Sequence, residues 1–215
     1  QGKTSSLLDI SSLAESQRNK SEASLLRNVG KIVSKIADFS ESDQKAIRHC
    51  LGIIIGGQIL DLQRFSSDEG TILSLESDEE LDDYAYRVAG SVGEFWTRMS
   101  LDHIFKLKEE NMEEELFEKG IRFGKALQMI NILRDVPADL SLGRCYIPRS
   151  KLKGHGMTPA DLLEPSSMDS FRPLYDEYLD LTDEYLTSAV QYIEMLPHWK
   201  LRLRAACMFP VIIGK

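Results

Sequence analysis

The stretch 124–148, GKALQMINILRDVPADLSLGRCYIP, places polar side chains on one side of an otherwise apolar helix. Gln128, Asn131, Asp135 and Asp139 are three, four and four residues apart, and at about 100° per residue these steps return to nearly the same side of a helix. The remaining positions are mostly apolar: Leu127, Met129, Ile130, Ile132, Leu133 and Val136. This pattern predicts a helix at the centre of the fold that carries one buried polar stripe, formed by those four residues.

The polar stripe needs partners or a ligand, because a buried unpaired amide costs about 1–3 kcal/mol and a lone carboxylate more. Asp135 and Asp139 lie one turn apart and near Arg144. This predicts a Mg²⁺ site that holds a phosphate, since Mg²⁺ favours one or two carboxylates together with substrate oxygens and water. A bridging cation is needed because like charges about 4 Å apart repel by roughly 4 kcal/mol at an effective dielectric near 20. For Asp139 alone, a cap or solvated charge at the helix end is the alternative.

The end of this helix is expected to be irregular. Pro137 removes a backbone donor and crowds the preceding turn, so we expect the helix to kink or end near Val136. The segment that follows reads as a turn with Gly143 in a strained conformation. That turn would carry Arg144 and Tyr146 back over the same end of the helix.

Composition limits the classes of protein. The chain has 215 residues, of which 42% are hydrophobic, so we expect one domain over 1–215. A net charge of −8 argues against nucleic acid as a partner. The 3 cysteines have no paired spacing, which indicates a reducing, cytoplasmic location. No signal peptide and no apolar run of about 20 residues is visible. The chain begins without Met and stops after an apolar run, as a piece of a longer protein would.

The rest of the chain also has helical spacing of its apolar residues, and no stretch alternates as a strand would. The sequence therefore predicts an all-α fold. The other expected helices are 5–19, 22–39, about 41–65 with Ser40 or Ser42 as its cap, 79–104, 157–163, 172–196 with Pro173 in its first turn, and 198–213.

Two features of the helix that ends near residue 65 have more than one interpretation. Gly56 and Gly57 are adjacent in the helix interior, which indicates the close approach of either another helix or a ligand. Asp61 lies on an apolar face. Three explanations of an aspartate at this position remain open: it is a functional group, it makes a buried hydrogen bond, or the helix bends before Arg64.

The helix predicted over 79–104 raises similar questions. Asp78 and Asp82 are one turn apart and mimic a metal pair, but we favour simple acidic residues at a helix N-terminus, where the helix dipole stabilises them. The small residues Ala89, Gly90 and Gly93 would let a neighbouring helix approach. Tyr84 is either a core tyrosine with one partner or a site residue that offers an aromatic face and a proton.

Four motifs occur in a characteristic order. GGQILDL is followed by YAYRVAGSVG, then by QMINILRDVPAD and finally by GRCYIP. In this order and with the pattern QxxNxxRDxxxD they resemble the squalene/phytoene synthase family, the head-to-head prenyltransferases, over roughly 56–148. The continuation GEFW is most similar to bacterial squalene synthase-type members.

The resemblance implies an all-α isoprenoid synthase-like bundle around a central cavity. In that cavity Mg²⁺ would assist the head-to-head condensation of two prenyl diphosphates, usually farnesyl diphosphate, to presqualene diphosphate, squalene or a related product. Asp135 and Asp139 match the second aspartate-rich, metal-binding motif. The other residues that the resemblance implicates are Tyr84 and Arg134 as catalytic groups, and Gln128, Asn131, Arg144 and Tyr146 as substrate-binding groups.

One part of the family pattern is missing. The first aspartate-rich motif, a DxxxD on a helix some tens of residues before GGQILDL, does not occur in this chain. We therefore expect a fold incomplete at its N-terminus and an isolated chain without activity. A noncatalytic helical binding or assembly protein of the same family is the alternative. The sequence does not indicate whether NADPH is used, and the lipophilic product suggests peripheral contact with a membrane.

Overall fold

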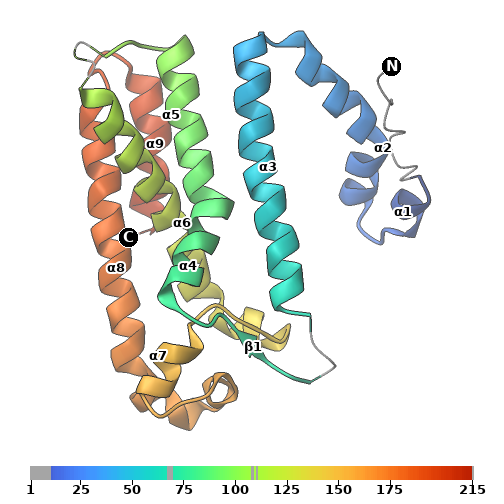
Figure 1. The fold of residues 1–215 in the computed structure, drawn as a ribbon, viewed down its shortest axis with the longest axis vertical. Coiled ribbons are helices and arrows are strands. Elements are labelled where there is room, and N and C mark those ends of the chain that lie inside the picture. Colours follow the sequence, from blue (N-terminus) through green and yellow to red (C-terminus); the bar gives the residue numbers. More distant parts are fainter. Residues whose placement is uncertain (1–10, 67–69, 108, 110, 215) are drawn as a thin grey trace. The chain divides into compact units, whose positions relative to one another are not determined.

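The computed structural model describes residues 11–66, 70–107, 109 and 111–214. Contacts divide the chain into two compact units, Gln1–Arg48 and His49–Lys215, so the expectation of a single domain stays a prediction. Both units are helical, which confirms the all-α class (Figure 1). Within the described ranges, none of the helices is long and apolar enough to cross a membrane.

The part of the first unit that the structure describes, from residue 11 onward, contains two short helices and the start of a long one. Helices α1 (Ser11–Ser16) and α2 (Lys20–Ser34) are followed by a 3₁₀ turn, η1 (Lys35–Asp38), and by α3 (Glu41–Arg64), which continues into the second unit. The Ser40 hydroxyl accepts a hydrogen bond from the Asp43 amide at 3.1 Å, so Ser40 is the predicted helix cap. The predicted first helix begins at residue 5, and its part before residue 11 lies outside the described residues.

The second unit is built around α6 (Met112–Ser141). This helix packs against α8 (Met168–Met195) and α5 (Ser91–His103), and it also contacts α4 (Asp78–Ala85) and α9 (Leu201–Gly214) (Figure 1). Its buried residues follow both sides of the helix, as expected for a central element. They are Leu116, Gly120, Gly124, Ala126, Met129, Ile132, Leu133 and Leu140.

Glycines let α5 and α6 approach each other closely. A side chain at Gly93 would overlap the carbonyl oxygen of Gly120, and one at Gly124 would overlap the carbonyl oxygen of Ala89. Gly57 plays the same part on α3, where an added Cβ would lie 2.8 Å from the Cβ of Arg87. The prediction that these small residues permit close approach is therefore confirmed, and at Gly57 the neighbour is a helix.

Two predicted helices have different limits in the structure. The helix predicted over 79–104 is interrupted by a π-helical turn, η2 (Tyr86–Gly90), which joins α4 to α5. Between α6 and α8 lie α7 (Arg149–Gly154) and the 3₁₀ turns η3 (Pro159–Leu163) and η4 (Pro165–Ser167). The expectation that Pro173 lies in the first turn of its helix is wrong, because α8 already begins at Met168.

The sequence predicts a kink or an end of α6 near Val136, and the structure contradicts the end. The helix continues through Pro137 to Ser141, so Asp139 lies in its last turn. Pro137 has no amide hydrogen to donate to the carbonyl of Leu133. That carbonyl accepts a hydrogen bond from the Tyr175 hydroxyl of α8 at 3.3 Å instead. A tertiary partner thus replaces the hydrogen bond that the proline removes.

A short strand pair fixes the segment after α6. Strand β1 (Leu73–Ser74) pairs in parallel with β2 (Arg144–Cys145), with Leu73 opposite Arg144. Gly143 turns the chain out of the helix with φ of 75°, in the left-handed region that favours glycine, as predicted. The turn and the strand pair together set the position from which Arg144 and Tyr146 extend.

Candidate functional site

The polar stripe of α6 lies at the border of the core. Gln128, Asn131, Asp135 and Asp139 are all half-buried. Within the part of the chain that the structure describes, the side chains of Gln128, Asn131 and Asp139 have no hydrogen-bond or ion-pair partner. Three of the four polar groups are therefore available to a ligand.

Asp135 is paired with its neighbour in the sequence. Arg134 donates two hydrogen bonds to the Asp135 carboxylate, at 2.8 and 2.7 Å. The guanidinium lowers the pKa of the Asp135 carboxyl below its ordinary value. Because 64% of the Arg134 side chain is exposed, this ion pair contributes little to stability.

Tyr84 and Tyr146 lie side by side although they come from distant segments. Their rings stack with centroids 4.6 Å apart, and the Phe65 ring meets Tyr146 edge to face at 5.2 Å. Burial raises the pKa of both tyrosines, so each hydroxyl keeps its proton near neutral pH and can act as a donor. The structure thus brings together two of the predicted site residues.

Asp61 belongs to the same group and was not among the predicted site residues. It comes from α3 and is only 8% exposed. Its Oδ2 accepts a hydrogen bond from the Tyr146 hydroxyl at 3.1 Å and one from Arg144 at 3.4 Å. An aspartate in the apolar sequence GGQILDL was the signal that could have found it. We call Asp61, Tyr84, Asp139, Arg144 and Tyr146 the polar cluster.

The charges of the polar cluster influence Asp139. Burial raises the pKa of its carboxyl, as do the negative charges of Asp135 and Asp61, whereas Arg144 lowers it. A cation at this place would relieve the repulsion between the carboxylates. Asp139 is unpaired and Asp135 is in an exposed ion pair, and both offer oxygen atoms as ligands. Such ligands suit Mg²⁺ when it is bound together with phosphate oxygens. The residues present therefore fit Mg²⁺, although the described ranges contain no group of three or more metal-ligating side chains.

An apolar cavity of about 360 Å³ lies between α5, α6, α8 and α9. Aromatic and aliphatic groups line it, among them Trp96, Phe123, Leu127, Tyr192 and Cys207. The hydroxyls of Tyr192 and Thr97 lie 3.1 Å apart and satisfy each other. The cavity therefore suits a hydrocarbon chain rather than a polar ligand.

The apolar cavity and the polar stripe follow one another along α6. Gly120, Gly124 and Leu127 line the cavity at spacings of four and three residues. Asn131 and Asp135 continue the same side of the helix at further steps of four residues. Because α6 rises about 1.5 Å per residue, Asp135 lies roughly 12 Å and Asp139 roughly 18 Å beyond Leu127 along the helix axis. This face of α6 therefore combines an apolar cavity with a polar, acidic end.

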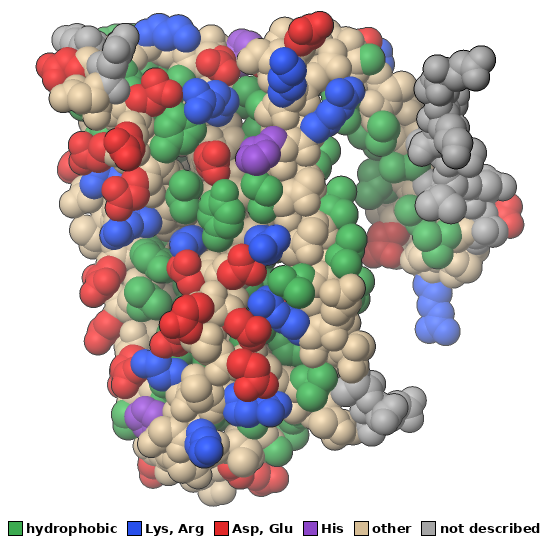
Figure 2. All heavy atoms as spheres, viewed as in Figure 1, with side chains coloured by type: hydrophobic (Ala, Val, Ile, Leu, Met, Phe, Trp, Pro, Cys, Tyr) green, Lys and Arg blue, Asp and Glu red, His purple; other side chains and the backbone are tan. Residues whose placement is uncertain are grey.

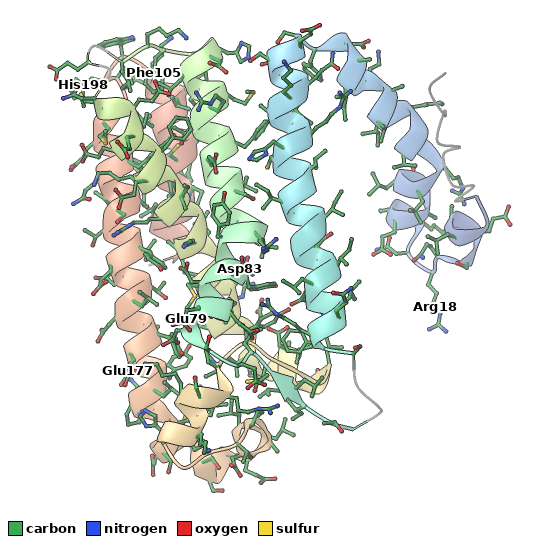
Figure 3. The ribbon with its side chains drawn as sticks, viewed as in Figure 1. Arg18, Glu79, Asp83, Phe105, Glu177 and His198 are labelled. Atoms are coloured by element: carbon green, nitrogen blue, oxygen red, sulfur yellow. The ribbon has the colours of Figure 1, made fainter. Side chains whose placement is uncertain are left out.

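Asp78 and Asp82 form ion pairs and hydrogen bonds within the protein. Asp78 accepts a hydrogen bond from the Tyr178 hydroxyl at 2.7 Å, and Asp82 accepts one from Lys125 at 2.6 Å. Figure 2 shows acidic and basic side chains interleaved over this face, and in Figure 3 the labels Glu79 on α4 and Glu177 on α8 locate it. The prediction that these aspartates are not a metal pair agrees with their partners.

Comparison with known proteins finds matches in one family. The family model described as squalene/phytoene synthase matches residues 10–214. The chain is 34% identical over 123 residues to a bifunctional lycopene cyclase/phytoene synthase of Gibberella fujikuroi. The aligned residues cover 57% of this chain and 21% of that protein. It is 30% identical over 121 residues to a 4,4'-diapophytoene synthase of Staphylococcus haemolyticus, and this alignment covers 56% of this chain and 40% of that protein. The chain thus spans less than half the length of these relatives.

Solved structures share the fold. A squalene synthase from Alicyclobacillus acidocaldarius matches with a TM-score of 0.60 and 21% identity, over 88% of this chain and 61% of that one. A dehydrosqualene synthase in complex with a ligand matches with a TM-score of 0.60 and 20% identity, over 77% of this chain and 52% of that one. The predicted isoprenoid synthase-like helical fold is therefore confirmed.

Proposed function

The chain belongs to the squalene/phytoene synthase family, and from this premise we propose that it carries one wall of a site for head-to-head condensation of two prenyl diphosphates. The substrate that we propose is farnesyl diphosphate, and the product is presqualene diphosphate, squalene or a related hydrocarbon. The observation that carries the proposal is the sequence of surfaces along α6, where the apolar cavity is followed by unpaired amides and then by carboxylates.

In this proposal the diphosphate lies at the polar cluster. Arg144, and Arg134 after release from Asp135, bind its oxygens, because guanidinium groups pair well with phosphate. Asp135 and Asp139 would hold Mg²⁺. When bound, the ion neutralises charge on the leaving diphosphate. The Tyr84 hydroxyl, which keeps its proton because burial raises its pKa, donates a hydrogen bond to the departing group.

The cavity binds the hydrocarbon chain and excludes water. When the allylic carbon–oxygen bond breaks, its electron pair leaves with the diphosphate and the chain becomes a carbocation. The alkene of the second substrate then forms the new carbon–carbon bond, and a proton is lost. The rings of Trp96, Phe123 and Tyr192 line the cavity and stabilise a cation through their π faces. A dry cavity also prevents capture of the cation by water.

The second candidate is a noncatalytic helical binding or assembly protein of the same family. One observation favours it. Among the described residues no three acidic or other metal-ligating side chains converge, whereas the family pattern has two aspartate-rich motifs. The polar stripe would then bind a prenyl diphosphate or another amphiphile without turnover. Peripheral contact with a membrane belongs to both candidates, since the ligand or product is lipophilic.

Incubation of the full-length protein with farnesyl diphosphate and Mg²⁺, with and without NADPH, tests the proposal. The extracted products are identified by mass spectrometry. Presqualene diphosphate or a C30 hydrocarbon is expected, and its formation should stop when EDTA removes the metal. Binding of farnesyl diphosphate without any coupled product would instead support the noncatalytic candidate.

A further inference from the structure

The carboxylate of Asp61 is incompletely paired in a buried place. Its Oδ2 accepts hydrogen bonds from Tyr146 and Arg144, whereas its Oδ1 is buried and has no hydrogen-bond partner among the described residues. A buried carboxylate oxygen without a partner is costly, and a well-packed apolar side chain would avoid that cost. Stability of the fold is therefore a poor reason for an aspartate at this position.

The partners of Asp61 suggest another reason. Arg144 and Tyr146 belong to a segment more than eighty residues away in sequence, and both are residues of the proposed diphosphate site. The Arg144 side chain is 33% exposed, and Asp61 is its ion-pair partner in the described structure. A flexible arginine binds an anion better when its guanidinium is already held in place.

Asp61 is unsuited to bind the substrate itself. A carboxylate repels a diphosphate, and neither oxygen of Asp61 is open to a bridging cation, because Oδ1 is buried and Oδ2 already accepts two hydrogen bonds. Any favourable effect of Asp61 on diphosphate binding therefore has to pass through Arg144 or Tyr146. Tyr146 in turn stacks on Tyr84, with centroids 4.6 Å apart. One carboxylate from α3 thus connects to two of the predicted substrate-binding residues directly and to Tyr84 through the stacked rings.

We propose that Asp61 is a positioning residue of the diphosphate site: it holds the Arg144 guanidinium in the orientation that receives the substrate's anionic end, and it anchors the Tyr146 ring beside that guanidinium by accepting the hydroxyl proton. The role rests on the proposed function, because it presumes that a diphosphate binds at the polar cluster. It adds a group from α3 to a site whose other members come from α4, α6 and the segment after α6.

A double-mutant cycle tests this role with inorganic diphosphate as the probe, in the presence of Mg²⁺ and measured by calorimetry on the full-length protein. Asp61→Asn and Arg144→Gln are each expected to weaken binding by about tenfold or more. Because Asp61 acts through Arg144, the double variant should bind no more weakly than Arg144→Gln alone. A merely structural aspartate would give losses that multiply.

Asp78→Asn is the matched control. Asp78 also accepts a tyrosine hydroxyl, from Tyr178 at 2.7 Å, and lies 3.5 Å from a cation, Lys151, but outside the polar cluster. Its replacement should leave diphosphate affinity unchanged. Circular dichroism and thermal unfolding check that every variant is folded. If Asp61→Asn does not fold, Asp61→Ala, which removes the buried carboxylate altogether, replaces it in the same cycle with Arg144→Gln, and its effect on diphosphate binding should again vanish when Arg144 is absent.

The outcomes separate the two proposals. If the unaltered protein binds diphosphate and Asp61→Asn binds it equally well, or if the losses multiply, the positioning role is overturned while the proposed function stands. If the unaltered protein does not bind diphosphate with Mg²⁺ at all, the proposed function fails and the positioning role fails with it. If the losses of diphosphate affinity in the two single variants are coupled, so that they do not multiply in the double variant, both the proposed function and the positioning role are supported.

Discussion

The rings of Tyr84 and Tyr146 stack at 4.6 Å with an interplanar angle of 24°, and they join α4 to the segment that follows α6. Tyr146 also donates its hydroxyl proton to Asp61 of α3. Two helices, α3 and α4, and the segment after α6 therefore meet at one pair of rings. Changes to either tyrosine should separate the effect of the ring, which packs, from the effect of the hydroxyl, which acts on the ligand.

Tyr84→Phe keeps the ring stack and removes the hydroxyl. We expect kcat to fall by about 10- to 100-fold, the effect of losing a hydrogen bond to a charged group, while KM changes little. Steady-state kinetics with farnesyl diphosphate measure both constants. Tyr178→Phe, which removes a hydroxyl outside the polar cluster, is the control. An equal loss of substrate binding and rate in Tyr84→Phe would assign Tyr84 to packing instead.

Asp135→Asn should abolish Mg²⁺-dependent turnover and leave the helical fold intact. The amide keeps the shape of the side chain but loses the charge that a divalent cation requires. Activity is measured over a range of Mg²⁺ concentrations, with circular dichroism for the fold. Asp78→Asn should retain activity, because Asp78 pairs with Tyr178 and Lys151. Unchanged activity in Asp135→Asn would remove Asp135 from the metal-binding role.

Gly124→Ala should destabilise the protein by about 1–3 kcal/mol, because the new methyl group would overlap the backbone of Ala89 and force η2 and α6 apart. Gly52→Ala on α3 is the matched control, since nothing lies within 4 Å of an added Cβ there. That change should stabilise the protein by about 0.5–1 kcal/mol through helix propensity. Urea unfolding of the two variants gives both values. Equal effects would show that the contact between the helices tolerates a side chain.

Asp61→Asn should raise the unfolding temperature at neutral pH, although it should weaken diphosphate binding. Burial raises the pKa of the Asp61 carboxyl above 3.8, its ordinary value, despite the opposing effects of Tyr146, Arg144 and Arg64. A carboxyl with a raised folded-state pKa binds its proton more tightly when folded. The stability that this carboxyl contributes is therefore lost as the pH rises from its pKa in the unfolded state through its higher pKa in the folded state.

The asparagine variant lacks that titration. Its advantage in unfolding temperature should be present at neutral pH and should disappear below about pH 4, where the aspartate is protonated in both states. Thermal unfolding across this range, without added metal, measures the difference. A lower unfolding temperature for Asp61→Asn at neutral pH would mean that the ion pair with Arg144 outweighs the cost of burial.

Local spacing was sufficient to predict much of the fold and part of the site. The polar stripe of α6, the small residues Gly93 and Gly57, the turn at Gly143 and the cap at Ser40 all depend on backbone geometry within a few residues. Such features follow from the helical period and from steric rules that hold in any protein. The family motifs are likewise contiguous in sequence, and the family match confirms that resemblance.

The sequence by itself determined that the chain is helical and that one helix carries amides and acids into an apolar core. Only the tertiary structure decided which distant groups meet those residues. The Tyr175 hydroxyl that lets α6 pass Pro137, the strand pair that fixes Arg144, and the approach of Asp61 to Tyr146 all join residues more than forty positions apart. A periodic pattern gives the side of a helix on which a residue lies. The neighbour on that side depends on how the whole chain packs, which no local pattern contains.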